Sequence, residues 1–294
     1  MHFTGTIWRP PYEANSALLQ VTAGCTHHNC KFCSLYADLP FQFRMSPMEE
    51  IEEDLQELRT YHSCAKRIFL TGANPFALSF EKLTEIAEKI HHYMPAVKSI
   101  GCFSRVTDIT PKTDEQLCSL HDLGYDAIII GTETGDNSTL DFMRKGYKAK
   151  DIVEQLNRLD SAKISYHISY LNGLTGAGKS HDSALATTEI YNKINPISLS
   201  IVALTIFPES DLFQDVKQGH FVETGELERL FEQKCLIENL TIPTTIYANT
   251  VSNVAPMTGK LPNDKQKMIQ HLQYAIDNID EAELRRYRES IKHL

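Results

Sequence analysis

Two hydrophobic periodicities alternate along the first two-thirds of this chain. Short apolar runs typical of buried strands occur six times, at 16–22, 67–71, 97–103, 126–131, 164–171 and 197–204. Longer stretches with apolar residues three and four positions apart separate them, at 47–61, 79–93, 112–123, 150–161 and 180–193. Strands that alternate with helices predict βαβ units and therefore a parallel sheet.

The spacing of these runs suits a barrel-like arrangement. Six units fit residues 1–205, whereas residues 206–294 look mainly helical, with one short β-prone segment at 244–247. We therefore expect an α/β fold, a partial (βα)6 TIM-like barrel, with a mainly helical C-terminal extension packed on it. Ligand sites in parallel α/β folds gather at the carboxyl ends of strands, so residues after each run are candidates for function.

Three cysteines follow the first apolar run, and Cys25, Cys30 and Cys33 lie within nine residues. Three thiolates on one loop can bind three irons of a [4Fe–4S] cluster and leave the fourth iron open to a small molecule. Zinc is the main rival, because His27 or His28 could complete a tetrahedral site with the cysteines. A purely structural role is the third alternative. The position directly after a strand favours iron, because that strand end should face the active site.

The other cysteines and the composition indicate the environment. The chain has 294 residues, 42% hydrophobic, enough for a sizeable core. Seven cysteines and no signal-like N-terminus favour metal ligation in a reducing cytoplasm over a disulfide framework. Four cysteines are widely separated, and we expect them to be small buried hydrophobic residues: Cys64, Cys102, Cys118 and Cys235.

Charge and hydropathy disfavour two classes of partner. The formal net charge is −9, so a general affinity for nucleic-acid phosphates is not expected. No run of 18 apolar residues occurs, so no membrane-spanning helix is expected either.

The run from Gly24 to Cys33 resembles the cluster loop of the radical SAM superfamily, with the first gap one residue longer than usual. That longer gap resembles a subgroup with Elp3/MiaB/NifB-like and coproporphyrinogen-dehydrogenase-like cores. The resemblance covers most of residues 5–265 and implies two cofactors, a [4Fe–4S] cluster on Cys25, Cys30 and Cys33 and S-adenosylmethionine. Phe32 would shield the cluster or stack on a nearby ring.

Further motifs match the family in order along the chain. Thr71, Gly72, Ala73 and Asn74 occupy the place of the motif that holds the amino group of S-adenosylmethionine. Its acidic residue is missing here, so carbonyls and Asn74 would accept those hydrogen bonds. Glu133 lies in a segment similar to the family's G-x-E-S-G motif, and would accept hydrogen bonds from the ribose hydroxyls or the amino group.

Basic and glycine-rich segments complete the expected cofactor site. Arg144 or Lys145 would bind the methionyl carboxylate, with Arg144 preferred because a guanidinium suits bidentate binding. Gly173 would let the backbone approach the adenine, and Leu204 would form another adenine wall. Arg9, Tyr12 and Glu13 also match the subgroup, and they would either face the substrate or belong to an N-terminal segment that docks on the barrel. The 247–262 segment receives no role.

The resemblance implies a radical SAM enzyme, an oxidoreductase or a transferase working anaerobically. Reductive cleavage of S-adenosylmethionine would give a 5′-deoxyadenosyl radical that abstracts hydrogen from the substrate. The chain has no room for an added RNA-binding domain, so a small molecule or a peptide is the expected substrate. A flavodoxin or ferredoxin would supply electrons. The alternative is a non-catalytic heme- or cluster-carrying protein built on the same domain.

Overall fold

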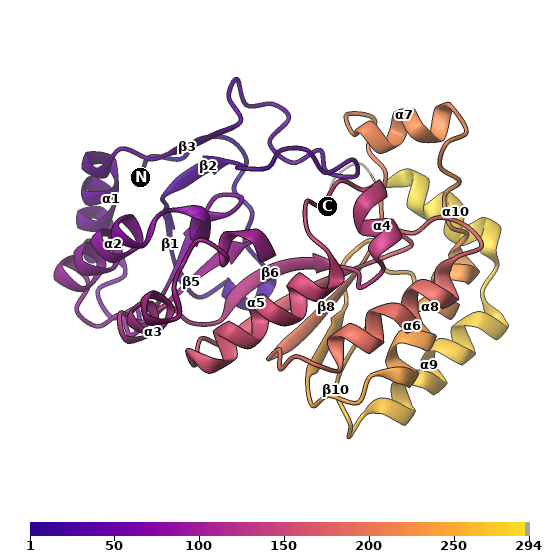
Figure 1. Cartoon of the computed structure of the whole chain (residues 1–294). Helices are drawn as coiled ribbons and strands as arrows, with labels where there is room; N and C mark the ends of the chain where they lie inside the picture. Colours follow the sequence, from indigo (N-terminus) through magenta and orange to yellow (C-terminus); the bar gives the residue numbers. More distant parts are fainter. Residues whose placement is uncertain (292–294) are drawn as a thin grey trace. The chain divides into compact units, whose positions relative to one another are not determined.

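The computed structural model describes residues 1–291 and divides the chain into two compact units (Figure 1). The first unit contains Met1–His28, Leu35–Ile130 and Arg158–Tyr166. The second unit contains Asn29–Ser34, Gly131–Asn157 and the chain from His167 onward. Strand β6 contributes residues to both units, and each unit is described separately below.

The first unit is built on parallel strands. Its strand order is β1 (Ala17–Gln20), β4 (Arg67–Thr71), β5 (Ser99–Ser104) and the start of β6 (Ile128–Glu133). A short antiparallel pair, β2 (Thr22–Gly24) and β3 (Phe43–Met45), continues from β1. The helices of this unit are α1 (Met48–Tyr61), α2 (Phe80–Tyr93) and α3 (Asp114–Asp122).

Helix α2 illustrates how local sequence builds this unit. Ser79 caps its first turn by accepting a hydrogen bond from the Lys82 amide, which satisfies one of the free N–H groups at the helix start. The apolar residues of α2 share one face of the helix and are fully buried: Leu83, Ile86, Ala87 and Ile90. Helix α1 packs on β1 and α2, and α2 packs on α3 (Figure 1).

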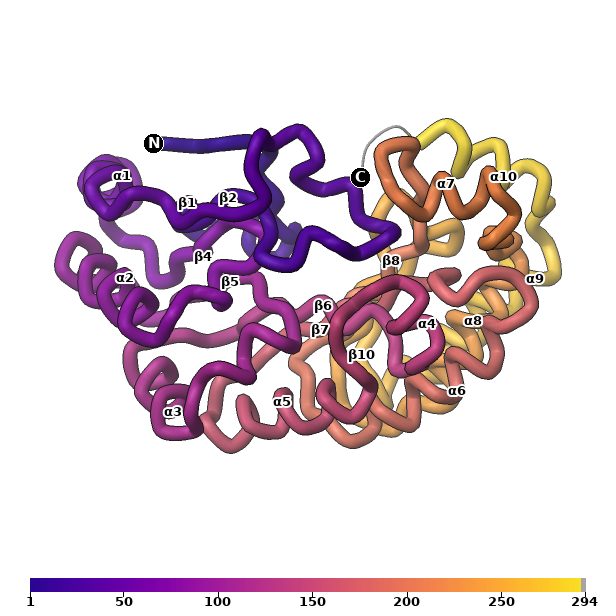
Figure 2. Tube along the Cα trace, turned by 45° about the horizontal axis from the view of Figure 1, so that its top comes forward, coloured from indigo at the N-terminus to yellow at the C-terminus, as the bar shows by residue number. Residues whose placement is uncertain are grey.

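The second unit continues the sheet from the end of β6. Parallel strands β7 (Tyr166–Asn172), β8 (Ser198–Ala203) and β9 (Thr245–Ala248) follow, and β10 (Met257–Lys260) pairs antiparallel with β9. Its helices are α4 (Asn137–Phe142), α5 (Ala149–Ser161), α6 (Ser180–Tyr191), α7 (Asp211–Lys217), α8 (Glu226–Asn239), α9 (Lys265–Asn278) and α10 (Glu281–Ser290). Helices α6, α8 and α9 lie side by side (Figures 1 and 2).

Strand β7 alternates strictly between fully buried and partly exposed residues. Tyr166, Ile168 and Tyr170 are buried, whereas His167 and Ser169 are partly exposed. One face of the strand is therefore open enough to contribute side chains to a site.

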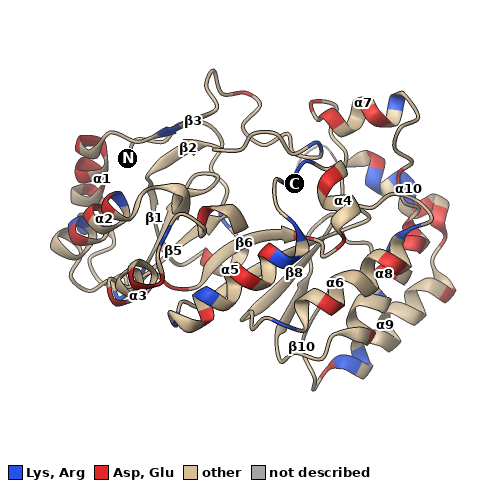
Figure 3. Ribbon diagram, in the orientation of Figure 1, with Lys and Arg blue, Asp and Glu red and all other residues tan. Residues whose placement is uncertain are grey.

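Charged residues are unevenly distributed over the helices. Acidic side chains crowd α1, which Figure 3 shows in red along much of its length. Across residues 1–291, no helix combines the length and the apolar character needed to cross a bilayer.

The α/β fold predicted from the periodicity is confirmed, with a mostly parallel eight-stranded sheet in the order β1-β4-β5-β6-β7-β8-β9-β10. Two details differ. The run at 16–22 divides at Val21 into β1 and β2. The stretch beyond residue 205 contributes two strands, and β10 was not predicted because Met257–Lys260 holds no apolar run. The proposed domains, 1–205 and 206–294, remain a prediction.

Candidate cofactor site

The cysteine loop starts from the β2–β3 pair in the first unit. The Cys25 amide donates to the Gln42 carbonyl at 2.8 Å. Gly24 has φ of +78°, and a Cβ there would overlap the Gln42 carbonyl oxygen. Glycine is therefore required directly before Cys25, because the loop leaves the strand pair through a backbone conformation that other residues adopt only with strain.

The end of the loop is a tight turn in the second unit. The Cys33 amide donates to the Cys30 carbonyl at 3.1 Å, so the two cysteines lie on one turn. Cys30 is partly exposed and Cys33 is exposed. Both residues therefore reach the protein surface.

The donor set fits an iron–sulfur cluster in its chemistry. None of the seven cysteines forms a disulfide, and Cys25 is partly exposed like Cys30. Across residues 1–291, the protein atoms alone do not gather three His, Cys, Asp or Glu side chains into a metal site. The loop thus fits an iron–sulfur cluster because it carries three cysteines that are at least partly exposed.

The segment after β4 is tightly packed against the first unit's own backbone. Thr71 is buried and donates to the Trp8 carbonyl at 3.3 Å. Gly72 has φ of +127°, and a Cβ there would overlap Thr22 Oγ1. The glycine therefore allows the backbone after β4 to approach Thr22 closely. Ala73 follows and is partly exposed.

Asn74 connects this segment to the cysteine loop within the first unit. Its Oδ1 accepts from the Thr26 amide at 3.2 Å, and its Nδ2 donates to Thr26 Oγ1 at 2.6 Å. Asn74 is fully buried. Its amide therefore holds the residue after Cys25.

Asp108 completes this arrangement, and sequence reasoning missed it. Its Oδ2 accepts from Asn74 Nδ2 at 3.0 Å and from the Arg105 amide at 2.7 Å. Burial raises the pKa of the Asp108 carboxyl, although these hydrogen bonds oppose the shift. Asp108 fixes the orientation of the Asn74 amide, and no spacing in the sequence joins the two residues.

An ion pair between a buried lysine and a largely buried glutamate lies in the second unit at the end of β6. Lys145 Nζ donates to Glu133 Oε1 at 3.1 Å, and the side chains are 5% and 14% exposed. Ser169 on β7 donates to Glu133 Oε2 at 3.2 Å. Glu133 has φ of +61°, and a Cβ at Gly131 would lie 2.5 Å from its Oε1. The backbone of Glu133 is strained, and its side chain needs the absence of a Cβ at Gly131. Backbone strain of this kind is typical of a functional position.

Aromatic rings and a cysteine surround the Lys145 ammonium group. Its Nζ lies 5.5 Å from the ring centroid of Phe32 and 5.6 Å from that of Tyr147. Burial alone would lower the pKa of Lys145, but the charges of Glu133, Tyr147 and Cys30 raise it above its ordinary value. Lys145 therefore carries its positive charge in the neighbourhood of Cys30.

Arg144 has a different environment from its neighbour. It forms an ion pair with Asp211 at 3.0 Å, and the two side chains are 47% and 65% exposed. Of the two basic residues considered for the methionyl carboxylate, Lys145 is therefore the one beside Glu133 and Phe32.

Gly173 packs against helix α8. Its φ is +82°, and a Cβ there would lie 2.5 Å from Arg229 Nη1. Its amide donates to Glu232 Oε1 at 3.0 Å, and burial raises the pKa of that carboxyl. Arg229 lies against the Cβ side of Gly173, and the expected approach of the Gly173 backbone to adenine stays a prediction.

Leu204 belongs to the apolar core of the second unit. It is 2% exposed and clusters with Met143, Leu174, Leu212 and Phe221, and Phe32 packs against this cluster. Leu204 thus supports Phe32, and its expected contact with adenine stays a prediction.

Of the N-terminal residues Arg9, Tyr12 and Glu13, one has a clear structural contact. Glu13 is buried and accepts from Arg67 Nη2 at 2.6 Å. Arg67 begins β4, so Glu13 lies at the amino end of that strand, opposite the end where ligands bind in parallel sheets. Glu13 therefore has a structural contact, whereas Arg9 is exposed and Tyr12 is partly exposed.

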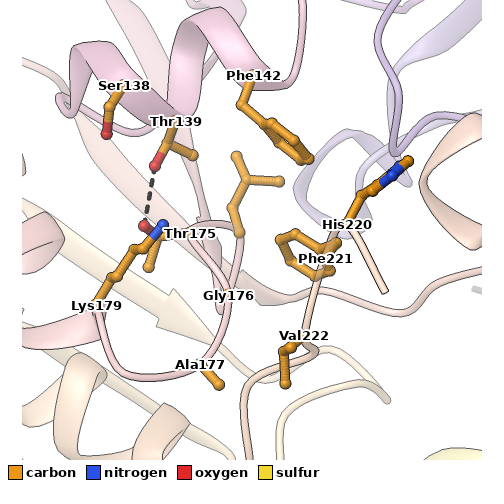
Figure 4. Close-up of a pocket in the computed structure, with 11 residues that line it drawn as sticks. Ser138, Thr139, Phe142, Thr175, Gly176, Ala177, Lys179, His220, Phe221 and Val222 are labelled. Carbon is orange, nitrogen blue, oxygen red and sulfur yellow. Dashed lines mark hydrogen bonds between the residues drawn. The ribbon is translucent and has the colours of Figure 1, made fainter. Parts of the chain in front are cut away.

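A pocket of about 410 Å³ opens in the second unit beside α4 and the loop after β7 (Figure 4). Thr139 Oγ1 donates to Thr175 Oγ1 at 3.0 Å across one side. On another side, the rings of Phe142 and Phe221 stack with centroids 5.9 Å apart. Its volume lies in the range of small-molecule sites.

These features define an α/β protein with a cysteine loop and a buried cation–carboxylate pair after a parallel strand. A family model described as the Radical SAM superfamily matches residues 19–187. The match spans more than half of the chain, so the chain belongs to the Radical SAM superfamily. Members of this superfamily are enzymes that use a [4Fe–4S] cluster and S-adenosylmethionine.

Individual relatives are distant. Biotin synthase from Rickettsia felis is 24% identical over 240 residues, which cover 79% of this chain and 75% of that protein. Methylornithine synthase, PylB, has a TM-score of 0.53 at 13% identity, covering 92% of this chain and 85% of that one. At such identities the structural likeness shows the fold alone.

A second solved structure is a larger protein. The radical S-adenosylmethionine methyltransferase TsrM from Kitasatospora setae, with cobalamin and a [4Fe–4S] cluster bound, has a TM-score of 0.58 at 15% identity. The similarity covers 69% of this chain but 37% of TsrM. The chain therefore spans well under half of that protein, and its activity does not transfer.

Proposed function

We propose that this chain is a radical SAM enzyme whose Cys25, Cys30 and Cys33 bind the [4Fe–4S] cluster. The observation that supports it best is the buried Glu133–Lys145 ion pair beside Phe32 and near Cys30. A buried cation and carboxylate suit the zwitterionic methionyl part of S-adenosylmethionine, because each can bind the opposite charge.

The chain's own residues then divide the work of binding. Lys145 replaces Arg144 as first candidate for the methionyl carboxylate, because Lys145 is buried and Arg144 is exposed in a pair with Asp211. Glu133 accepts hydrogen bonds from the ribose hydroxyls or the amino group. Asn74 holds the start of the loop through Thr26.

The remaining candidates shape the site. Phe32 covers the cluster side, supported by Leu204. Thr71, Gly72 and Ala73 lie at the end of β4 in the first unit, where Thr71 and Gly72 are closely packed, and Gly173 is closely packed after β7 in the second unit. These residues exclude water and hold the cofactor in one orientation, which is the protein's share in cofactor chemistry.

When bound, the [4Fe–4S] cluster and S-adenosylmethionine would supply radical chemistry that removes a hydrogen atom from the substrate. We propose a small molecule or a peptide as substrate, a flavodoxin or ferredoxin as electron donor, and the cytoplasm as location. The formal net charge of −9 supports this substrate class over a nucleic acid.

The test is an anaerobic assay on the full chain. The protein is reconstituted with iron and sulfide, reduced with dithionite and incubated with S-adenosylmethionine, and 5′-deoxyadenosine is measured by chromatography. We expect it to form, and Cys33→Ala to abolish both its formation and most of the bound iron. Cys118→Ala is the matched control, because Cys118 lies outside the loop and is exposed like Cys33. Its exposure, like that of Cys64, contradicts the burial expected from the sequence.

Three outcomes would contradict the proposal. Zinc in place of iron after anaerobic reconstitution would contradict the cluster. Full iron content in Cys33→Ala would contradict the ligand set. Stoichiometric heme binding without cofactor cleavage would favour the carrier alternative.

A further inference from the structure

Lys31, between Cys30 and Phe32, is anchored through both its backbone N–H and its backbone carbonyl. Its amide donates to the Met143 carbonyl at 3.2 Å, and its carbonyl accepts from the Leu212 amide at 2.8 Å. Both partners lie in the second unit, directly after α4 and in the first turn of α7. The backbone of the turn is therefore held from two sides, independently of any cofactor.

The Lys31 side chain adds a charged anchor to this backbone attachment. Its Nζ donates to Asp215 Oδ2 on α7 at 2.7 Å, and the two side chains are 13% and 16% exposed. The same Nζ lies 4.0 Å from the ring centroid of Phe142, the last residue of α4. An ion pair this well shielded is stronger than one at the open surface, because water screens it less.

The aromatic contact links the turn to the wall of the pocket. Phe142 stacks on Phe221 with an interplanar angle of 18°, and both rings line the pocket in Figure 4. Phe32, the residue after Lys31, packs against the core cluster that includes Phe221. Backbone, ion pair and rings thus hold the Cys30–Cys33 turn in one position.

We propose that Lys31 and Asp215 are a positioning pair that holds the cysteine turn and sets the charge next to the cluster. The inference rests on the proposed function, because it assumes that Cys30 and Cys33 bind the cluster. Reduction adds negative charge to a cluster, and nearby charge is one of the factors that set its potential. Lys31 favours the reduced form, and Asp215 limits that effect by neutralising Lys31.

This charge balance predicts opposite effects for two single variants. Lys31→Met removes the cation, so we expect the midpoint potential of the reconstituted cluster to fall. Asp215→Asn leaves the cation without its counter-charge, so we expect the potential to rise. The double variant Lys31→Met/Asp215→Asn should return towards the wild-type potential. A merely structural role would lower iron loading in all three variants without shifts of opposite sign.

The full chain is first reconstituted with iron and sulfide. A redox titration then measures the midpoint potential, with electron paramagnetic resonance reporting the reduced cluster. Iron and sulfide contents report cluster loading separately from potential. Lys217→Met is the matched control. Lys217 lies on α7 like Asp215, but its Nζ is 4.4 Å from the ring centroid of Phe213. It should leave the potential unchanged.

The outcomes separate this inference from the function on which it rests. If the wild type loads no iron–sulfur cluster, the proposed function fails. If the wild type loads and reduces normally but both single variants keep its potential, or shift it in the same direction, the positioning pair is wrong.

Discussion

Replacing Lys145 with Met would leave the Glu133 carboxylate buried without its cation. The nitrogen–oxygen distance is 3.1 Å, and the Lys145 and Glu133 side chains are 5% and 14% exposed. At that distance and an effective dielectric constant of about 20, the attraction is about 5 kcal/mol. Part of it offsets the desolvation of both charges, so removing one partner should cost about 3 kcal/mol of unfolding free energy.

A double-mutant cycle isolates this pair from the surrounding contacts. The four proteins are the wild type, Lys145→Met, Glu133→Gln and the double variant, each unfolded in urea without cofactors and followed by circular dichroism. We expect a coupling free energy of about 2 kcal/mol or more, because the double variant no longer buries a lone charge. The same variants should bind S-adenosylmethionine more weakly in an equilibrium binding assay.

The exposed Arg144–Asp211 pair is the matched control for this cycle. Its separation is 3.0 Å, close to that of the buried pair, but its side chains are 47% and 65% exposed. Its coupling should stay below about 1 kcal/mol, because water screens the charges. Equal coupling energies for the two pairs would refute the reasoning, since burial would then have no effect.

Three further predictions follow from single residues. Gly72→Ala should lower the unfolding free energy by about 3 kcal/mol or more, because the added Cβ overlaps Thr22. Gly178→Ala is the control and should cost about 1 kcal/mol, because Gly178 has φ of +80° but no atom within 4 Å of its Cβ position. Equal losses in urea unfolding would argue against the contact with Thr22. Burial raises the pKa of Cys102 to about 12, whereas Cys118 is exposed. Iodoacetamide at pH 8 should therefore label Cys118 but not Cys102 in the native protein, which mass spectrometry can measure. Equal labelling of the two cysteines would contradict the burial of Cys102. Burial lowers the pKa of Lys112 from 10.5 to about 8, so the unfolded chain holds an extra proton between these values. Between these pH values, the unfolding free energy of the wild type should therefore rise relative to that of Lys112→Met, by roughly 3 kcal/mol in total. Parallel curves of unfolding free energy against pH would show that Lys112 keeps its ordinary pKa.

The sequence alone determined the strands and helices of the α/β core, because period-specific apolar patterns are local properties of the chain. The run at 67–71 coincides with β4, and the segment at 244–247 overlaps β9. The three-cysteine loop was equally readable, since the ligand types and their spacing are contiguous. Strand β10 escaped prediction because it forms by pairing with β9 rather than through an apolar pattern of its own.

Only the tertiary structure decided which neighbouring residues share an environment. Arg144 and Lys145 are adjacent in sequence, yet one is half-exposed beside Asp211 and the other is buried beside Glu133. The contacts of Lys31 with Asp215 and of Gly173 with Arg229 join residues far apart along the chain. Such contacts depend on how helices pack against the strands, and no local pattern of hydrophobic and polar residues encodes that packing.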